Sequence, residues 1–422
     1  MMSAMRSIVG RSAMPAAFVA VWAVLCWSVA LAADSPQTDA IVLTDGTSIK
    51  DCVVTDETWR EALAYRPSDS TEVKLPQSGI DHVEFSAMPL LYKIGRTNLE
   101  QGRWQTAVDS FTQVLADESA KSKPWVKQYA LYNVAESRRV LAELAGDASA
   151  LRKAADAYAK LLQEVPETKF KHDALLAIAR CAEEQAALAG TADEKAAAIT
   201  RAEDAYRNFD EACKKDLTDP SFAAALALRA GQAKIGALSL KYLSAASADD
   251  FSKLAAEFRA LAGEAGEPEE IALQANLWAA KCDLAAGGEG NANAPAAVKA
   301  IEDQIEKIAA SNIADAKQQV MLVDAYSALG GHYFALAQMQ LADKPERKDL
   351  EAKAALAYLR IALLYPLTPG AEAQCQNAFY RAILIMKERG EVYLTKNLYA
   401  AMGETFAESD FWKNTASKML TQ

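Results

Sequence analysis

The spacing of apolar positions divides the chain into two regions of different secondary structure. Between residues 38 and 86, apolar residues come in short runs separated by turn residues, as in "AIVL", "TDG" and "TSIKDCVV". From Met88 onward they recur at three- and four-residue spacing in long stretches rich in Ala, Leu, Glu, Lys and Gln. The first pattern is typical of β-strands and the second of amphipathic helices. We therefore expect a small β unit at 38–86 followed by a mainly α region.

The β unit is expected to be a small curled sheet or barrel of short strands. Asp45-Gly46 supplies a hairpin turn, and "TWREALAY", "EVKL" and "HVEF" continue the strand pattern. The strand spacing resembles that of SH3-like and Sm-like units found before repeat domains in envelope proteins. Trp59 and Tyr65 are either core residues of this sheet or the walls of a peptide groove, and core packing is the commoner role of such aromatics.

Two segments of the helical region carry almost the same phrase. "KAADAYAKLLQEVP" occupies 153–166, and "KAALAYLRIALLYP" occupies 353–366. Gly and Pro gather between the helical runs, which predicts a series of helical hairpins. The second phrase is apolar nearly all round, so we expect it to be the more deeply buried of the two.

The hairpins resemble tetratricopeptide repeats. In that family the first helix carries a W-x2-L-G-x2-Y pattern, and the second carries A-x3-F with a late Pro. The small residue lets two helices approach closely, and the aromatic residue fills the space beside it. The positions that match the pattern, and that the resemblance assigns to packing within the repeats, are Gly95, Ala107, Phe111, Ala154, Tyr158, Ala202, Tyr206, Gly330, Tyr333, Ala354 and Tyr358.

The repeat length departs from that family. Phe111 and Tyr158 are 47 positions apart, and Tyr158 and Tyr206 are 48 apart, whereas the usual repeat is about 34 residues. Longer helices or longer loops must absorb the difference. We expect a TPR-like α-solenoid of about six or seven hairpins over 88–405, closed by a capping helix at 406–422.

The first 32 residues are predicted to be a signal peptide. Arg6 and Arg11 precede an apolar run, and Ala30 and Ala32 form an A-x-A cleavage motif. The alternative is a retained membrane anchor, which the shortness of the run disfavours. We expect cleavage after Ala32 and export to the periplasm or cell envelope.

Composition and charge narrow the classes of partner. Hydrophobic residues make up 51% of the chain and charged residues 24%, as in a packed globular protein. The net charge is −11, and it becomes −13 when the two Arg of the signal peptide are removed. Such an acidic balance argues against nucleic acid and anionic lipid as main partners. Envelope proteins or peptides are the expected partners, and the oligomeric state is left open.

Catalytic, cofactor and metal motifs are absent from the sequence. It contains three His, and it lacks a zinc-protease motif, a nucleophile elbow, a P-loop and a dinucleotide fingerprint. The five Cys beyond the signal peptide are far apart and form no C-x-x-C pair. One disulfide among them is possible, and the sequence does not identify its two residues. Acid pairs such as Glu183-Glu184 are interpreted as solvated surface charges. We expect no catalytic residue, cofactor or metal.

The resemblance to tetratricopeptide proteins implies a binding scaffold whose first helices line a concave groove. Pro-x-Thr follows the helix in both "VPETKF" and "YPLTPG", which is similar to periplasmic tetratricopeptide proteins of outer-membrane assembly and of the Tol–Pal-associated division coordinator. The expected groove residues are Tyr92, Arg96, Asn98, Tyr132, Arg138, Arg180 and His332.

Two alternative functions stay open from the sequence. The first is a structural subunit of an envelope complex that docks through its β unit. The second is an enzyme with a site between the β unit and the solenoid, for which His82 and nearby acids are the candidate residues.

Overall fold

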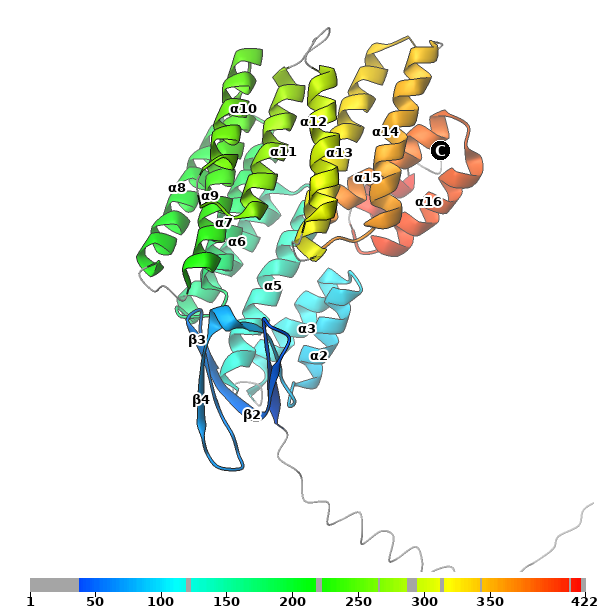
Figure 1. The fold of residues 1–422 in the computed structure, drawn as a ribbon. Helices are drawn as coiled ribbons and strands as arrows, with labels where there is room; N and C mark the ends of the chain where they lie inside the picture. Colours follow the sequence, from blue (N-terminus) through cyan, green and yellow to red (C-terminus); the bar gives the residue numbers. More distant parts are fainter. Residues whose placement is uncertain are drawn as a thin grey trace, which may run out of the picture.

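A small antiparallel sheet precedes a long series of stacked helices in the computed structural model (Figure 1). The predicted signal peptide lies outside the described residues, so its cleavage stays a prediction. Within the described part of the chain, no helix is long and apolar enough to cross a membrane. The structure describes residues 38–118, 123–217, 222–264, 266–286, 294–311, 315–341, 344–409 and 411–418.

Five antiparallel strands form the sheet in the order β4-β3-β2-β1-β5. Gly46, with φ +82°, makes the predicted hairpin turn between the first two strands. One face of the sheet buries apolar side chains against the first helices, and β5 returns beside β1 to complete it. The strands are β1 (Asp39–Leu43), β2 (Ser48–Glu57), β3 (Glu61–Tyr65), β4 (Glu72–Pro76) and β5 (Ile80–Glu84).

Seven helical hairpins follow the sheet within the described residues. This order of a small β unit and then helical repeats is the one that the hydrophobic pattern predicts. The hairpins are α2 (Leu90–Glu100) with α3 (Trp104–Ala116), α5 (Pro124–Ala145) with α6 (Ala148–Glu164), α7 (Lys171–Leu188) with α8 (Ala192–Asp216), α9 (Ala223–Ser244) with α10 (Ala248–Ala262), α11 (Glu269–Ala286) with α12 (Ala294–Ala310), α13 (Asp315–Met339) with α14 (Pro345–Leu364), and α15 (Glu372–Glu388) with α16 (Val392–Thr405).

Small residues face aromatic rings where helices come closest. A Cβ atom on Gly95 would lie 2.8 Å from the ring of Phe111, and one on Gly330 would lie 2.8 Å from the ring of Tyr358. Both glycines therefore permit an approach that a larger residue would block. A third glycine, Gly236 on α9, meets the ring of Tyr206 on α8 in the same way. It lies in the region where the repeat pattern is hard to recognise.

The first helices of the last six hairpins form a closed ring. In the order α5, α7, α9, α11, α13 and α15, each helix contacts the next, and α15 contacts α5. The Gln376 side chain on α15 donates a hydrogen bond to the Leu144 carbonyl on α5 at 3.0 Å. Trp104 and Leu144 belong to the same buried cluster as Phe379 and Phe406, at the opposite end of the helical region.

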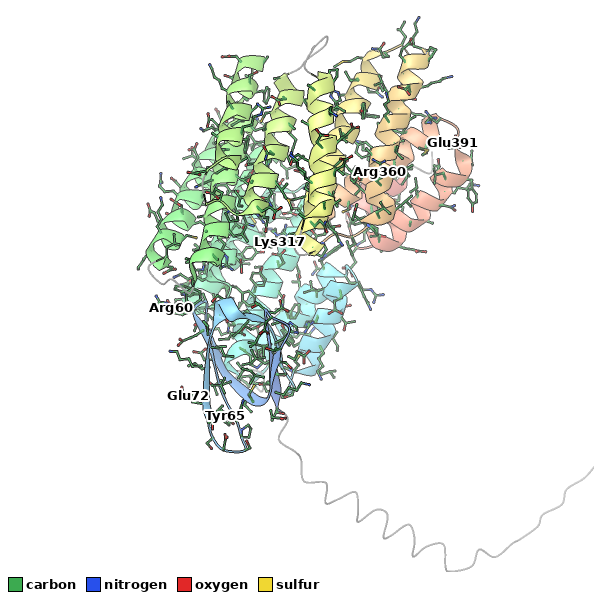
Figure 2. All side chains as sticks on the ribbon, viewed as in Figure 1. Arg60, Tyr65, Glu72, Lys317, Arg360 and Glu391 are labelled. Atoms are coloured by element: carbon green, nitrogen blue, oxygen red, sulfur yellow. The ribbon has the colours of Figure 1, made fainter. Side chains whose placement is uncertain are left out.

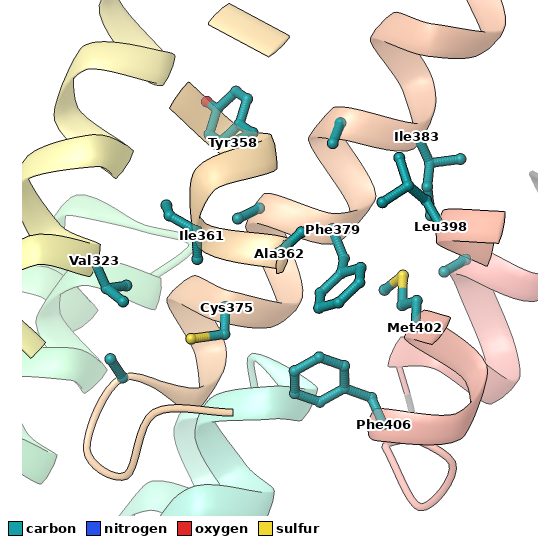
Figure 3. Close-up of a cluster of buried hydrophobic side chains, with 14 of the residues drawn as sticks. Val323, Tyr358, Ile361, Ala362, Cys375, Phe379, Ile383, Leu398, Met402 and Phe406 are labelled. Atoms are coloured by element: carbon teal, nitrogen blue, oxygen red, sulfur yellow. The ribbon is translucent and has the colours of Figure 1, made fainter. Parts of the chain in front are cut away.

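The segment after α16 completes this closure. Phe406 lies inside the core drawn in Figure 3, beside Phe379 and Met402. The Glu408 carboxylate accepts hydrogen bonds from the Gln105 backbone amide at 3.1 Å and from the Thr106 hydroxyl at 3.0 Å, both on α3. The end of the described chain thus packs against the beginning of the helical region, and the repeats surround an interior instead of forming an open arc.

The prediction that the second copy of the repeated segment, 353–366, is the more deeply buried one is wrong. Leu356, Leu363 and Leu364 on α14 are 52%, 64% and 63% exposed. The helix belongs to the outer layer of the ring, where one face packs inward and the other meets solvent. Its inward face is supplied by Ala354, Ala355, Ala357, Tyr358, Ile361 and Ala362.

Candidate functional site

A cavity of about 210 Å³ lies on the inner side of the ring. Side chains from α7, α9, α11, α13 and α15 form most of its wall, and we call it the central cavity. Arg180 and Gln374 are exposed within it, so water reaches the cavity. Its apolar wall includes Ile235, Leu277, Trp278 and Met321.

Two acidic side chains of the central cavity already have partners. The Glu183 carboxylate accepts a hydrogen bond from the Tyr206 hydroxyl at 2.5 Å and another from the Ser239 hydroxyl. The Asp324 carboxylate pairs with the Lys281 ammonium at 3.0 Å. That ammonium also lies 3.7 Å above the centre of the Trp278 ring. These acids are therefore fixed in place by their neighbours.

Four other polar side chains of the cavity have no hydrogen-bond or ion-pair partner among the described residues. They come from four different helices, and all line the same space. An amide offers both donors and an acceptor, and a guanidinium offers several donors, so the set can bind a polar ligand from several sides. The four residues are Arg180, Gln232, Gln274 and Gln374.

The acidic groups around the cavity have perturbed pKa values. Burial raises the pKa of the Glu183 carboxyl, more than its hydrogen bonds with Ser239 and Tyr206 lower it. Burial, together with the charges of Glu143 and Glu183, raises the pKa of Glu184 to about 7. Glu184 is nevertheless exposed to water. Glu183 lines the central cavity and is partly buried, so the interpretation as a surface charge does not hold for this member of the pair.

The predicted groove residues do not meet in one site. Arg180 lines the central cavity. Arg138 is exposed and lines a separate groove between α3 and α5, together with Gln105 and Asp109. Arg96 is exposed on α2, where it pairs with Glu100 at 3.4 Å.

Tyr92 and Asn98 are not exposed groove residues, contrary to expectation. Tyr92 makes edge-to-face contacts with Phe111 and Trp125 in the core beneath the sheet. Asn98 is buried and donates a hydrogen bond to the Ile94 carbonyl at 2.9 Å. The β unit covers the start of α2, which is why Tyr92, placed on the inner wall by the repeat pattern, is enclosed.

Tyr132 and His332 are half-buried and lie apart from the central cavity's lining. Tyr132 stacks on Phe170 with the ring centres 4.1 Å apart. The His332 ring centre lies 5.7 Å from that of Tyr333 on the same helix. Burial lowers the pKa of His332.

The junction between the β unit and the helices is packed. Trp59 inserts there, with its ring centre 5.1 Å from His172 and 5.6 Å from Phe222. Its indole nitrogen donates a hydrogen bond to the Glu167 carboxylate at 2.9 Å. His82 lies elsewhere, exposed on β5 beside Asp81, and the two cavities described above are not at this junction.

A second set of contacts at the junction centres on a buried acid. Glu57 pairs with the Lys169 ammonium at 2.6 Å and accepts a hydrogen bond from the Tyr129 hydroxyl at 2.7 Å. Gln128 donates to the Glu57 carbonyl at 2.8 Å. The β unit is thereby fixed on α5 and on the segment before α7.

The three glutamines of the central cavity were not predicted from the sequence. Glutamine is common on helices, and nothing in the residue pattern distinguishes Gln232, Gln274 or Gln374 from a solvated glutamine. The available clue is Gly236, four residues after Gln232, because it marks α9 as a helix in close contact with its neighbour. That clue places the helix but not the cavity.

Comparisons with known proteins leave the chain without an assigned relative. No protein-family model matches the sequence, and no curated protein matches it. Among solved structures, the chain is similar to a "Circular tandem repeat protein with novel repeat topology and enhanced subunit contact surfaces", with 11% sequence identity. That match covers 78% of this chain and 85% of the other, at a TM-score of 0.27. A likeness at this TM-score carries no functional information.

Proposed function

We propose that the protein is a non-catalytic scaffold, exported to the cell envelope, that binds proteins or peptides through the inner side of its tetratricopeptide-like ring. The observation that carries this proposal is the convergence of Arg180, Gln232, Gln274 and Gln374 on the central cavity without partners among the described residues. Because water reaches the cavity, these donors and acceptors can bond to water in the free protein. A ligand with matching polar groups can replace this water.

The export part of the proposal rests on the sequence. The basic start, the apolar run and the A-x-A motif before Ala33 have the order of a secretory signal. The acidic balance of the rest of the chain favours proteins or peptides over nucleic acid. Fractionation of cells that express a tagged protein tests this, together with sequencing of its N-terminus. A tagged protein that keeps residues 1–32 and stays in the cytoplasm would contradict export.

The binding test compares two exposed arginines on first helices. Arg180 lines the central cavity, and Arg138 lines the separate groove between α3 and α5. Purified wild-type protein, Arg180→Glu and Arg138→Glu are each used to capture proteins from envelope extracts. We expect the proteins retained by wild type and by Arg138→Glu to be lost from Arg180→Glu, with unchanged melting temperatures.

Two outcomes would contradict the binding proposal. In the first, all three proteins retain the same set. In the second, Arg138→Glu alone loses it, which would place the working surface in the outer groove. Should Arg180→Glu lower the melting temperature, Gln274→Ala replaces it, because removing a neutral amide introduces no charge into the cavity.

The β3–β4 hairpin gives a second candidate function, docking of the β unit in a larger envelope complex. This hairpin projects away from the helices, and Tyr65 and Glu72 lie on it (Figures 1 and 2). The outer edge of β4 pairs with no described strand. Tyr65→Ser with Glu72→Lys should abolish assembly if this surface docks, and should leave capture through Arg180 unchanged. Intact assembly in this double variant would exclude the hairpin.

A further inference from the structure

Arg180 is a cationic side chain of the central cavity, and its charge lowers the pKa of the nearby Glu183 and Glu136 carboxyls. Lys281, a nearby cation, pairs with the Asp324 carboxylate of the cavity and lies over the face of Trp278. Arg180 makes no ion pair with any described residue, although it is exposed within the cavity. A guanidinium presents a rigid fork of donors that matches two oxygens of one anionic group. The cavity therefore offers one cationic group whose donors make no hydrogen bond or ion pair with the described residues.

The neutral part of the wall limits what that ligand can be. Gln232, Gln274 and Gln374 present donors and acceptors together, which suits the N–H and C=O groups of a peptide. Ile235, Leu277 and Trp278 supply an apolar wall for methylene groups. A volume of about 210 Å³ is below the range of roughly 300–1,000 Å³ that encloses drug-sized ligands. The space fits one side chain with the peptide groups next to it.

We infer that the central cavity is a carboxylate-binding site, and that the carboxylate is an internal acidic side chain of the bound partner. This rests on the proposed scaffold function. The carboxylate pairs with Arg180, the methylene groups lie against the apolar wall, and the three glutamine amides bind the partner's adjoining peptide groups.

An ammonium ligand is the main competing possibility, because acids surround the cavity. Both oxygens of Glu183 accept hydroxyl hydrogen bonds, and Asp324 is already paired with Lys281. Glu183 and Glu184 lie three and four residues after Arg180 on α7, and the charge of Arg180 lowers the pKa of the Glu183 carboxyl. Both carboxylates can therefore compete for its guanidinium. The pKa of Glu184 is raised to about 7, so it is partly neutral near physiological pH. Its competition with a bound carboxylate is reduced accordingly.

Four small probes separate these possibilities in the purified protein. The first is N-acetyl-glutamate N-methylamide, a single acidic residue between two peptide groups. The glutamine and lysine analogues test the charge, and glutarate tests a free carboxylate without peptide groups. Binding is followed through the NMR signals of the side-chain amides of Gln232, Gln274 and Gln374, each assigned by its Gln→Leu variant.

We expect the glutamate probe to bind about tenfold more tightly than its glutamine analogue, as a charge-assisted pair should. Arg180→Gln should abolish this preference. Glu184→Gln should strengthen binding of the glutamate probe, since it removes both a competing carboxylate and a like charge. Arg138→Gln is the matched control outside the cavity and should change nothing.

Several results would overturn the inference. Tighter binding of the lysine probe, weakened by Glu184→Gln, would make the cavity an ammonium site. Equal binding of glutarate and the glutamate probe would make the ligand a free acid and not a partner's side chain. Absence of binding by all four probes would remove the site altogether.

Failure of this inference can be told apart from failure of the scaffold proposal. If envelope proteins are captured through Arg180 while no probe binds, the scaffold stands and the carboxylate site falls. If the glutamate probe binds while capture is the same for all variants, the carboxylate site stands and the scaffold falls.

Discussion

The two copies of the repeated phrase differ in their outward faces and agree in their inward faces. Both bury the Ala and the Tyr: Ala154 and Ala354 are 0% exposed, and Tyr158 and Tyr358 are 0% and 4% exposed. Asp156 on α6 and Leu356 on α14 occupy equivalent places, and both are exposed. The residues that the two copies share thus specify packing within the ring of helices, and the residues that differ specify what each helix presents to solvent.

The two tyrosines also differ in what their hydroxyls touch. The Tyr158 hydroxyl donates a hydrogen bond to the Glu136 carboxylate on α5, and Glu136 also pairs with Arg139. The Tyr358 ring instead packs against Gly330, and its hydroxyl has no hydrogen-bond partner among the described residues. The same residue type therefore joins a polar network in one hairpin and fills a gap in the other.

Removing the aromatic side chain of either tyrosine should have the largest effect on stability. Tyr158→Ala and Tyr358→Ala should each lower the free energy of unfolding by ~3–5 kcal/mol, because each leaves a cavity beside a fully buried alanine. Chemical denaturation of the two variants measures this. A loss below about 1 kcal/mol at Tyr358 would show that the second copy does not share the inward packing of the first.

Enlarging the small residue should cost less stability than removing the aromatic side chain of the tyrosine. Ala354→Phe should lower the free energy of unfolding by ~1–3 kcal/mol, since it forces a second ring into a filled space. Ala154→Phe is the matched change in the first copy. An unchanged melting temperature in Ala354→Phe would refute close packing at that position.

Removing only the hydroxyls should separate the two copies. Tyr158→Phe should cost ~1–3 kcal/mol, because the half-buried Glu136 carboxylate loses a donor. Tyr358→Phe should stay within about 0.5 kcal/mol of wild type. Equal losses in the two variants would mean that the hydrogen bond with Glu136 contributes no stability.

The Tyr158 effect should also depend on pH. Burial alone would raise the pKa of Glu136, but the charge and hydrogen bonds of Arg139 and the hydrogen bond of Tyr158 more than offset it and leave the pKa lowered. The stability from ionised Glu136 is therefore present above its unfolded pKa of 4.5 and is lost as pH falls through the lower folded value. The difference between Tyr158→Phe and wild type should shrink in acid, while that of Tyr358→Phe should not change.

Copying the outward face of α6 onto α14 should have the smallest effect on stability. Leu363→Gln with Leu364→Glu should change the free energy of unfolding by no more than about 0.5 kcal/mol, because both leucines are exposed. Self-association at high concentration should decrease, as sedimentation velocity would show, because an apolar patch is removed. A stability loss of several kcal/mol would reveal buried contacts for these leucines.

Local features of the fold could be predicted from the sequence because they depend on neighbouring residues. Asp45-Gly46 predicts its turn through the φ that Gly46 adopts, and the small–aromatic pairs Gly95–Phe111 and Gly330–Tyr358 predict close helix contacts. The pair at Gly236 was missed because its aromatic partner, Tyr206, lies on the preceding hairpin and not on the same one. The burial of Tyr92 was missed because the repeat pattern of α2 contains no information on how the preceding β unit packs against that helix.

By itself, the sequence determined the order of elements, the hairpins and the residues that pack their helices together. Only the tertiary structure decided that α15 meets α5, that Arg180 and three glutamines share one cavity, and that Leu363 and Leu364 face solvent. The physical reason is that a hairpin's own residues fix its internal packing, whereas ring closure depends on the small rotations between hairpins added over the whole series. The central cavity exists because that sum brings the last helices against the first.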